Sequence, residues 1–264
     1  MSHRRSHRRS TTPQRKRKRA FVLVSALGAT SALLYGCLPN SLDITAELRL
    51  SDRSSGNPAQ AVPRPEATAA VAPPKPEIPA RGSGTFLTAG DTLRPVGEGS
   101  PRRYRVQVED SLDLSPSKTA REVNTVLGDP RGWTTGGHAF QLVASEPADF
   151  TIKVASAATV DALCGAAGLD TQGEVNCTVG STVVVNLKRW MLGSPQFDGP
   201  LKEYRALIIN HEVGHRLGRG HEGCPGQGKI APAMMQQIKG LDGCKANAWP
   251  YDAQGAYIQG PPVP

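Results

Sequence analysis

The feature that most constrains this chain is a run of three histidines and one glutamate between residues 211 and 221. On a helix, His211 and His215 are separated by only about 40° around the axis, so both can face one metal ion. Six further helical residues would carry His221 about 9 Å along the axis and onto another face. The helix is therefore predicted to end at Gly218, because glycine readily adopts the left-handed conformation that lets the chain turn back.

Three neutral imidazoles are a donor set that suits Zn²⁺, and they leave the fourth tetrahedral position to water, as in catalytic zinc sites. Glu212 lies one step round the helix, beside the predicted ion. Its carboxylate can accept a proton from that water and later pass it to a leaving amine. A chance match of the pattern has a probability on the order of 10⁻⁵ for this composition. We therefore predict one catalytic Zn²⁺ ion, with Glu212 as the base.

The stretch resembles, at five positions, the long zinc-binding signature of the metzincin metallopeptidases: His211, Glu212, His215, Gly218 and His221. Metzincins also have a methionine turn beneath the metal, and the residues from 233 to 236 look like that turn, with Met235 as its methionine. The resemblance implies an α+β, metzincin-like zincin domain. In such a domain a mixed, twisted sheet backs the active-site helix, an edge strand binds substrate, and a small irregular C-terminal subdomain contains the methionine turn.

The chain is also similar to an uncharacterised actinobacterial family of secreted or membrane-anchored metzincin-like proteins, known only as a domain of unknown function. Four stretches carry this similarity: residues 210–215, 221–224, 231–237 and 247–250. It implies zinc-dependent peptide hydrolysis and nothing more specific.

The amino-terminal residues predict export. Nine of the 31 basic residues lie in a tail at residues 1–19, predicted to be cytoplasmic, and the 23 acidic residues nearly balance the remainder. The folded part is therefore not expected to bind nucleic acid. Residues 20–38 are uncharged and could cross about 28 Å of hydrocarbon as a helix. By the positive-inside rule, everything after them is expected outside the cytoplasm.

Three fates of residues 20–38 remain open: a transmembrane anchor, a lipoprotein signal or a cleaved signal peptide. Residues 34–37 resemble a bacterial lipobox, in which Cys37 would be lipidated. An anchor or a lipid would hold the catalytic domain at the outer face of the cell membrane. A cleaved signal would make the protein secreted.

Composition divides the rest of the chain into a linker and a domain. Residues 39–101 are rich in Pro, Ala and Gly, which predicts an extended extracytoplasmic linker, with a propeptide as the alternative. Residues 102–264 are predicted to be the metallopeptidase domain, with a single core. Hydrophobic patterns there predict strands at 104–109, 138–144, 150–155 and 182–186, and helices at 115–127 and 200–217. The resemblance places the edge strand in or near residues 173–180.

Four cysteines follow Cys37, an even number that fits disulfides in an oxidising compartment. Of the three possible pairings, we favour Cys164 with Cys177 and Cys224 with Cys244. A second zinc site is the alternative, although the spacing typical of structural zinc is missing.

These features predict a zinc endopeptidase of the cell envelope that cleaves extended segments of exported proteins. Two alternatives remain open. A zinc-stabilised module could bind peptides without cleaving them, or the same chemistry could hydrolyse an amide bond of the cell wall.

Overall fold

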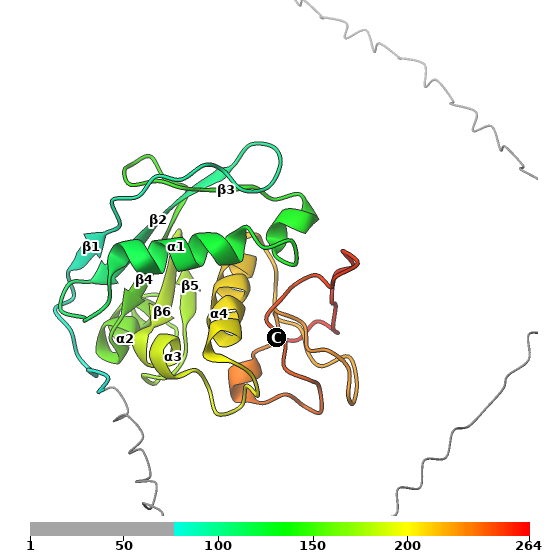
Figure 1. The fold of residues 1–264 in the computed structure, drawn as a ribbon. Coiled ribbons are helices and arrows are strands. Elements are labelled where there is room, and N and C mark those ends of the chain that lie inside the picture. Colours follow the sequence, from blue (N-terminus) through cyan, green and yellow to red (C-terminus); the bar gives the residue numbers. More distant parts are fainter. Residues whose placement is uncertain (1–76) are drawn as a thin grey trace, which may run out of the picture. The chain divides into compact units, whose positions relative to one another are not determined.

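The computed structural model describes residues 77–264, which contain a six-stranded mixed sheet (Figure 1). Its strands are β1 (Phe86–Thr88), β2 (Arg102–Glu109), β3 (Phe140–Leu142), β4 (Phe150–Ala155), β5 (Cys177–Val179) and β6 (Thr182–Asn186). They lie in the order β1-β2-β4-β6-β5, with β3 also paired to β2. The β2, β3, β4 and β6 pairings are parallel, while β1 and β5 run antiparallel to their neighbours. The structure therefore confirms an α+β fold with a mixed sheet.

Helices pack against both faces of this sheet. They are α1 (Pro116–Leu127), α2 (Ala157–Gly165), α3 (Leu187–Leu192) and α4 (Leu201–Arg216), with two short 3-10 helices, η1 (Trp133–Gly136) and η2 (Gln237–Lys239). Helices α1 and α4 share the main core with one face, whereas α2 covers the other. Apart from η2, the chain after α4 is a series of loops joined by isolated bridges.

Strand β6 shows how the sequence specifies this layering. Side chains alternate between the faces of a strand, so a run of valines requires burial on both. Val183 and Val185 belong to the core beneath α1 and α4, while Val184 packs with α2. All three are fully buried, as a run of valines in one strand requires.

Helix α1 begins and ends as its sequence predicts. The side chain of Ser115 accepts a hydrogen bond from the backbone N–H of Lys118, and Pro116 occupies the first helical position. Gly128 caps the other end, where its N–H donates to Asn124. Each cap satisfies backbone groups that the helix itself leaves without partners.

The folded region begins earlier than the predicted boundary at residue 102. Strand β1 lies inside the predicted linker, where it pairs with β2. Ala89 belongs to the core and Ile78 packs against it. A three-residue strand and a few buried side chains hardly change the average composition of a long segment, so composition does not reveal them.

The expectation of a transmembrane helix is corrected. No helix within residues 77–264 is long and apolar enough to cross a bilayer. The longest helix of this range, α4, has 16 residues and carries Lys202, Glu203 and Arg205, whereas a span needs about 20 apolar residues. Residues 20–38 and Cys37, on which the anchor and lipid predictions rest, lie outside the described residues.

Candidate metal centre

Helix α4 and the turn after it bring the three predicted histidines together. The Nε2 atoms of His211 and His215 are 3.3 Å apart on one face of α4. The helix ends at Arg216, and Gly218 follows with a φ of +81°. The returning chain places His221 with its ring centroid 4.7 Å from that of His215. One nitrogen from each ring lies within 4.8 Å of the other two.

Backbone carbonyls orient these rings. The Nδ1 atom of His211 lies 2.9 Å from the Ala233 oxygen, and that of His215 lies 2.9 Å from the Arg219 oxygen. A ring that donates from Nδ1 keeps the lone pair of Nε2 free, which is the usual arrangement of a metal-binding histidine. Convergent lone pairs repel one another unless a cation lies between them, so this donor set fits Zn²⁺.

Burial lowers the pKa of two of the three histidines. Burial, with a smaller contribution from the neighbouring His215, lowers the pKa of His211 to about 3. Burial also lowers the pKa of His221 below its usual value, again with a contribution from His215. Metal binding requires neutral imidazoles, so these two rings need not lose a proton at neutral pH before binding an ion.

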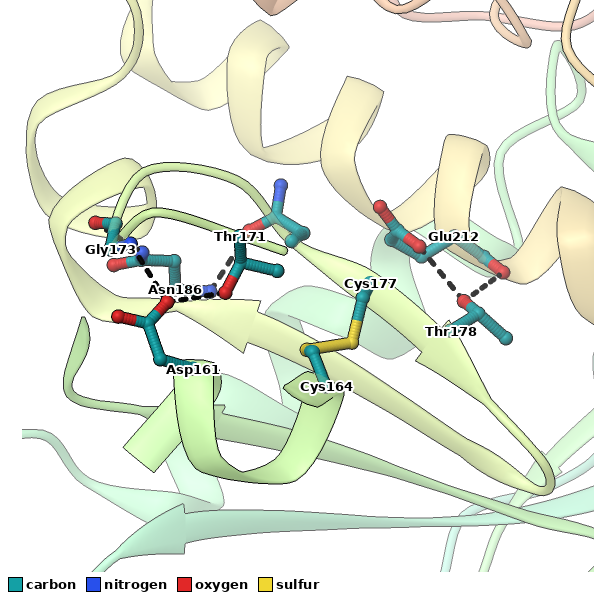
Figure 2. Close-up of a disulfide and its surroundings, with 9 residues drawn as sticks. Asp161, Cys164, Thr171, Gly173, Cys177, Thr178, Asn186 and Glu212 are labelled. Carbon is teal, nitrogen blue, oxygen red and sulfur yellow. Dashed lines mark hydrogen bonds between the residues drawn. A yellow bond between two sulfur atoms is a disulfide. The ribbon is translucent and has the colours of Figure 1, made fainter. Parts of the chain in front are cut away.

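Glu212 is buried beside the cluster. Only 5 % of its surface is exposed, and burial raises its pKa to about 7. The hydroxyl of Thr178 lies 2.8 Å from its Oε2 atom and 3.0 Å from its backbone oxygen (Figure 2). A carboxyl group with a pKa near neutrality can both accept and return a proton efficiently. Sequence reasoning did not single out Thr178; its only signal was its place in the predicted edge strand.

Thr178 belongs to β5, which forms an edge of the sheet and lies within the predicted range of residues 173–180. The predicted disulfide between Cys164 and Cys177 is present, and it links β5 to α2 (Figure 2). Residues 169–172, residues 174–178 and the histidine cluster line one cleft, with Gln236 and Lys239 also in its wall. The edge strand therefore borders the cleft into which the three histidines face.

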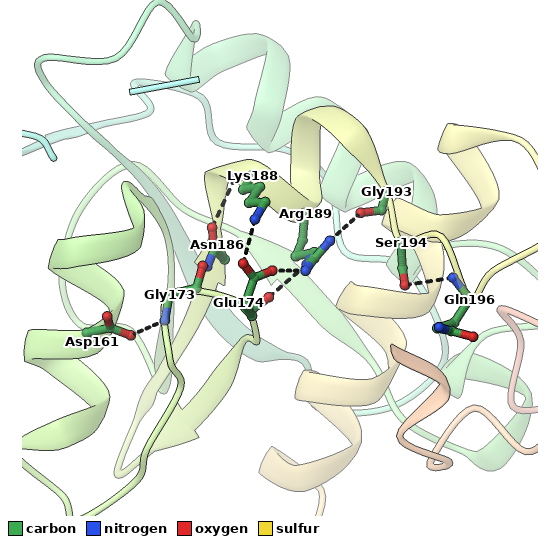
Figure 3. A network of polar contacts seen from close by, with 9 residues as sticks. All are labelled: Asp161, Gly173, Glu174, Asn186, Lys188, Arg189, Gly193, Ser194 and Gln196. Atoms are coloured by element: carbon green, nitrogen blue, oxygen red, sulfur yellow. Dashed lines mark hydrogen bonds and ion pairs between the residues drawn. The ribbon is translucent and has the colours of Figure 1, made fainter. Parts of the chain in front are cut away.

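The loop that leads into β5 is anchored by polar contacts (Figure 3). The N–H of Gly173 donates to Asp161 of α2 at 2.8 Å, and its carbonyl accepts from Asn186 at 2.9 Å. Glu174 forms ion pairs with Lys188 and Arg189 of α3. These contacts fix the start of the edge strand relative to α2 and α3, neither of which was predicted from the sequence.

The predicted methionine turn also lies against the cluster. Its Ala233 carbonyl is the acceptor for His211. Met235 lines a hollow together with His211 and Glu212. Met234 is fully buried against α4, where a Cβ atom on Gly214 would lie 2.3 Å from its Sδ atom. The structural role assigned to Met235 remains a prediction.

The second predicted disulfide, Cys224–Cys244, is also present in the described residues. Cys244 packs with Ala231 and Met235, with Cys224 against them. The disulfide therefore closes a loop that starts just after His221 and contains the methionine turn.

Together, fold and site define an α+β domain in which one helix and the loop after it assemble a three-histidine cluster beside a buried glutamate. The family model described as a protein of unknown function (DUF3152) matches residues 72–253. The chain belongs to this family. No curated protein and no solved structure matches the chain.

Proposed function

We propose that this protein is a metzincin-like, zinc-dependent endopeptidase that acts on exported proteins. His211, His215 and His221 would bind one Zn²⁺ ion, and Glu212 would be the catalytic base. The observation that carries the proposal is the convergence of three imidazole nitrogens within 4.8 Å, beside a carboxyl group that is 5 % exposed.

When bound, the zinc ion would polarise the substrate carbonyl and lower the pKa of a water molecule. Glu212 accepts the proton of the attacking water and delivers it to the leaving amine nitrogen. Thr178 donates a hydrogen bond to one carboxylate oxygen of Glu212 and leaves the other free to take the proton. The carbonyls of Ala233 and Arg219 hold the rings of His211 and His215 in the binding orientation.

Two features beside the cluster suit an extended peptide. Strand β5 lies at the edge of the sheet and along the cleft, so a peptide could pair with it through main-chain hydrogen bonds. A neighbouring hollow has both polar and apolar lining, and its apolar side chains come largely from α4 and from the region of the methionine turn: Tyr204, Leu207, Ile208, Met235 and Ile238. We propose that it accepts an apolar side chain of the substrate.

The two disulfides support a place of action outside the cytoplasm, because such bonds persist in oxidising compartments. Both lie next to the cleft: Cys177 is in the edge strand, and Cys224 follows the third histidine by three residues. The substrates we propose are therefore proteins that share this oxidising compartment.

The test compares the purified protein with Glu212→Gln on a mixed peptide library, with bound zinc quantified in both. We expect about one zinc ion per chain in each protein, because Glu212 is not a proposed ligand. The variant should lose at least about 100-fold in kcat/KM, which is the usual contribution of a general base. Cleavage sites should have an apolar residue beside the cut bond.

Two outcomes would contradict the proposal in different ways. Equimolar zinc without cleavage of any peptide would exclude a general peptidase and favour a peptide-binding module or a cell-wall amidase. If the wild-type protein did not bind stoichiometric zinc, the proposed metal centre itself would be wrong.

A further inference from the structure

The third histidine lies outside α4, so its position depends on other parts of the chain. Residues 257–264, here called the 257–264 segment, run alongside the loop that carries it. Two backbone hydrogen bonds join the two and form an antiparallel bridge between Glu222 and Pro262: a 2.7 Å bond from the Gly223 nitrogen to the Pro261 oxygen, and a 3.1 Å bond from the Val263 nitrogen to the His221 oxygen.

Glu222 ties this segment to the metal centre through its side chain. One carboxylate oxygen accepts a 2.8 Å hydrogen bond from the hydroxyl of Tyr257, and the other accepts a 2.9 Å bond from the Gly260 nitrogen. The backbone N–H of Glu222 donates to the oxygen of Met234 at 3.1 Å. The residue next to His221 therefore connects the 257–264 segment with the methionine turn, whose Ala233 carbonyl orients His211.

Tyr257 also contacts the support of the second ligand. The guanidinium of Arg219 lies 5.0 Å from the centre of its ring, and the carbonyl of Arg219 is the acceptor for His215. The ring of Trp133 lies 6.2 Å away on the core side. One tyrosine thus contacts both the Glu222 carboxylate behind His221 and the residue that orients His215.

We propose that the 257–264 segment contributes to the metal centre. Glu222 and Tyr257 are positioning residues: they fix His221 in place and thereby set the affinity for zinc. This inference rests on the zinc site of the proposed function. The family match ends at residue 253, so it does not include Tyr257 or the segment. Groups that orient metal ligands typically contribute about 10- to 100-fold to metal affinity.

The experiment measures Zn²⁺ affinity of the full-length chain by competition with a chelator, and records the visible absorption of the Co²⁺-substituted protein. The variants are Glu222→Gln and Tyr257→Phe, which keep the size of each side chain. Tyr251→Phe is the matched control. Tyr251 belongs to the same aromatic cluster, 5.4 Å from Tyr257 between ring centres, but within the described residues its hydroxyl makes no hydrogen bond to Glu222.

We expect Glu222→Gln to weaken Zn²⁺ binding by about 10-fold or more, Tyr257→Phe to weaken it less, and Tyr251→Phe to leave it unchanged. The Co²⁺ spectrum should change in the first two variants, because it reports ligand geometry and not stability. If Glu222→Gln does not fold, Tyr257→Phe, which removes a single hydroxyl, carries the test. The inference would be overturned if Tyr257→Phe, and Glu222→Gln where it folds, kept the wild-type zinc affinity and the wild-type Co²⁺ spectrum. The proposed zinc site would not be affected by that result. A wild-type chain that binds no zinc would overturn both.

Discussion

The two halves of the candidate metal centre are built in different ways. One half is the last two turns of α4, where His211, Glu212 and His215 are placed by regular helix geometry and by burial against the core. The other half follows α4, and it positions His221 with a disulfide, backbone bridges and the carboxylate of Glu222. The first half is therefore specified by neighbours in sequence, and the second by contacts across the irregular segment.

This difference shows how a site can combine local and distant constraints. The periodic hydrogen bonds of a helix fix His211 relative to His215 at little additional entropic cost, because the helix exists anyway. A loop has no such framework, so each residue that it orders must be held by particular contacts. The irregular half should consequently be the more sensitive of the two to the loss of a single cross-link.

The largest effect should follow from opening the disulfide of the irregular half. The double variant Cys224→Ser/Cys244→Ser should lose about 3 kcal/mol in the free energy of unfolding and bind zinc at least roughly ten-fold more weakly. The matched control is Cys164→Ser/Cys177→Ser, which should lose similar stability without weakening zinc binding, because that disulfide joins β5 to α2. Urea unfolding and chelator competition measure the two quantities. Equal zinc affinities in the two double variants would erase the proposed difference between the halves.

A smaller loss of stability is expected from a substitution at the contact between the two halves. Alanine normally stabilises a helix by up to about 1 kcal/mol relative to glycine. In Gly214→Ala, however, the added Cβ would lie 2.3 Å from the Sδ atom of Met234 and 2.9 Å from Trp133. We expect a net loss of about 1–2 kcal/mol, because both neighbours are fully buried.

The control for this variant is Gly165→Ala, since Gly165 is a helical glycine of α2 with open space around it. It should be neutral or stabilising by up to about 1 kcal/mol. Thermal unfolding of both variants gives the comparison. Stabilisation by Gly214→Ala would mean that Met234 does not pack tightly enough to couple the irregular half to α4.

Substitution of Glu109 should have the smallest effect on the metal centre. Glu109 is the last residue of β2. This buried carboxylate accepts hydrogen bonds from Thr159 and from the backbone of Ser156 and Gly84. Burial alone would raise its pKa, but these bonds outweigh burial and hold the pKa below the usual value. Its contribution to stability is therefore complete above the unfolded-state pKa of about 4.3 and is lost as the pH falls through the lower, folded value.

The wild-type protein should accordingly lose more stability between about pH 6 and pH 3 than Glu109→Gln, which has no charge to titrate at this position. Zinc affinity at pH 7 should be the same in both proteins. Urea unfolding across this pH range provides the measurement. Parallel stability curves would show that Glu109 titrates normally in the folded state.

The sequence predicted the parts of the fold that depend on local patterns. Ser115, Pro116 and Gly128 mark the ends of α1, and the valines of β6 mark a strand buried on both faces. The turn at Gly218 was predictable because two ligands on a helix and a third six residues later require the helix to end. Both disulfide pairings were also anticipated.

The features that were not predicted depend on contacts between residues that are distant in sequence. Strand β1 is three residues long and is defined by its pairing with β2. Helix α2 has only nine residues, and although Ser156 stands at its N-cap, its residues lack a clear amphipathic pattern. Thr178 and Tyr257 acquire their places only when the edge strand and the 257–264 segment fold against the histidines. No spacing rule links Tyr257 to Glu222, which precedes it by 35 residues.

The short edge strand has one more consequence, for the behaviour of the protein in concentrated solution. Open sheet edges invite pairing with other copies of a chain, and β5 lies beside a cleft that must stay accessible. At three residues it offers very few backbone groups for such pairing. The carbonyl of Gly180, at the turn beyond the strand, already accepts a hydrogen bond from Arg216. An edge of this length leaves room for the short stretch of peptide that we propose as substrate, yet it is too small to nucleate an intermolecular sheet. The molecule can therefore keep its cleft open without promoting its own aggregation.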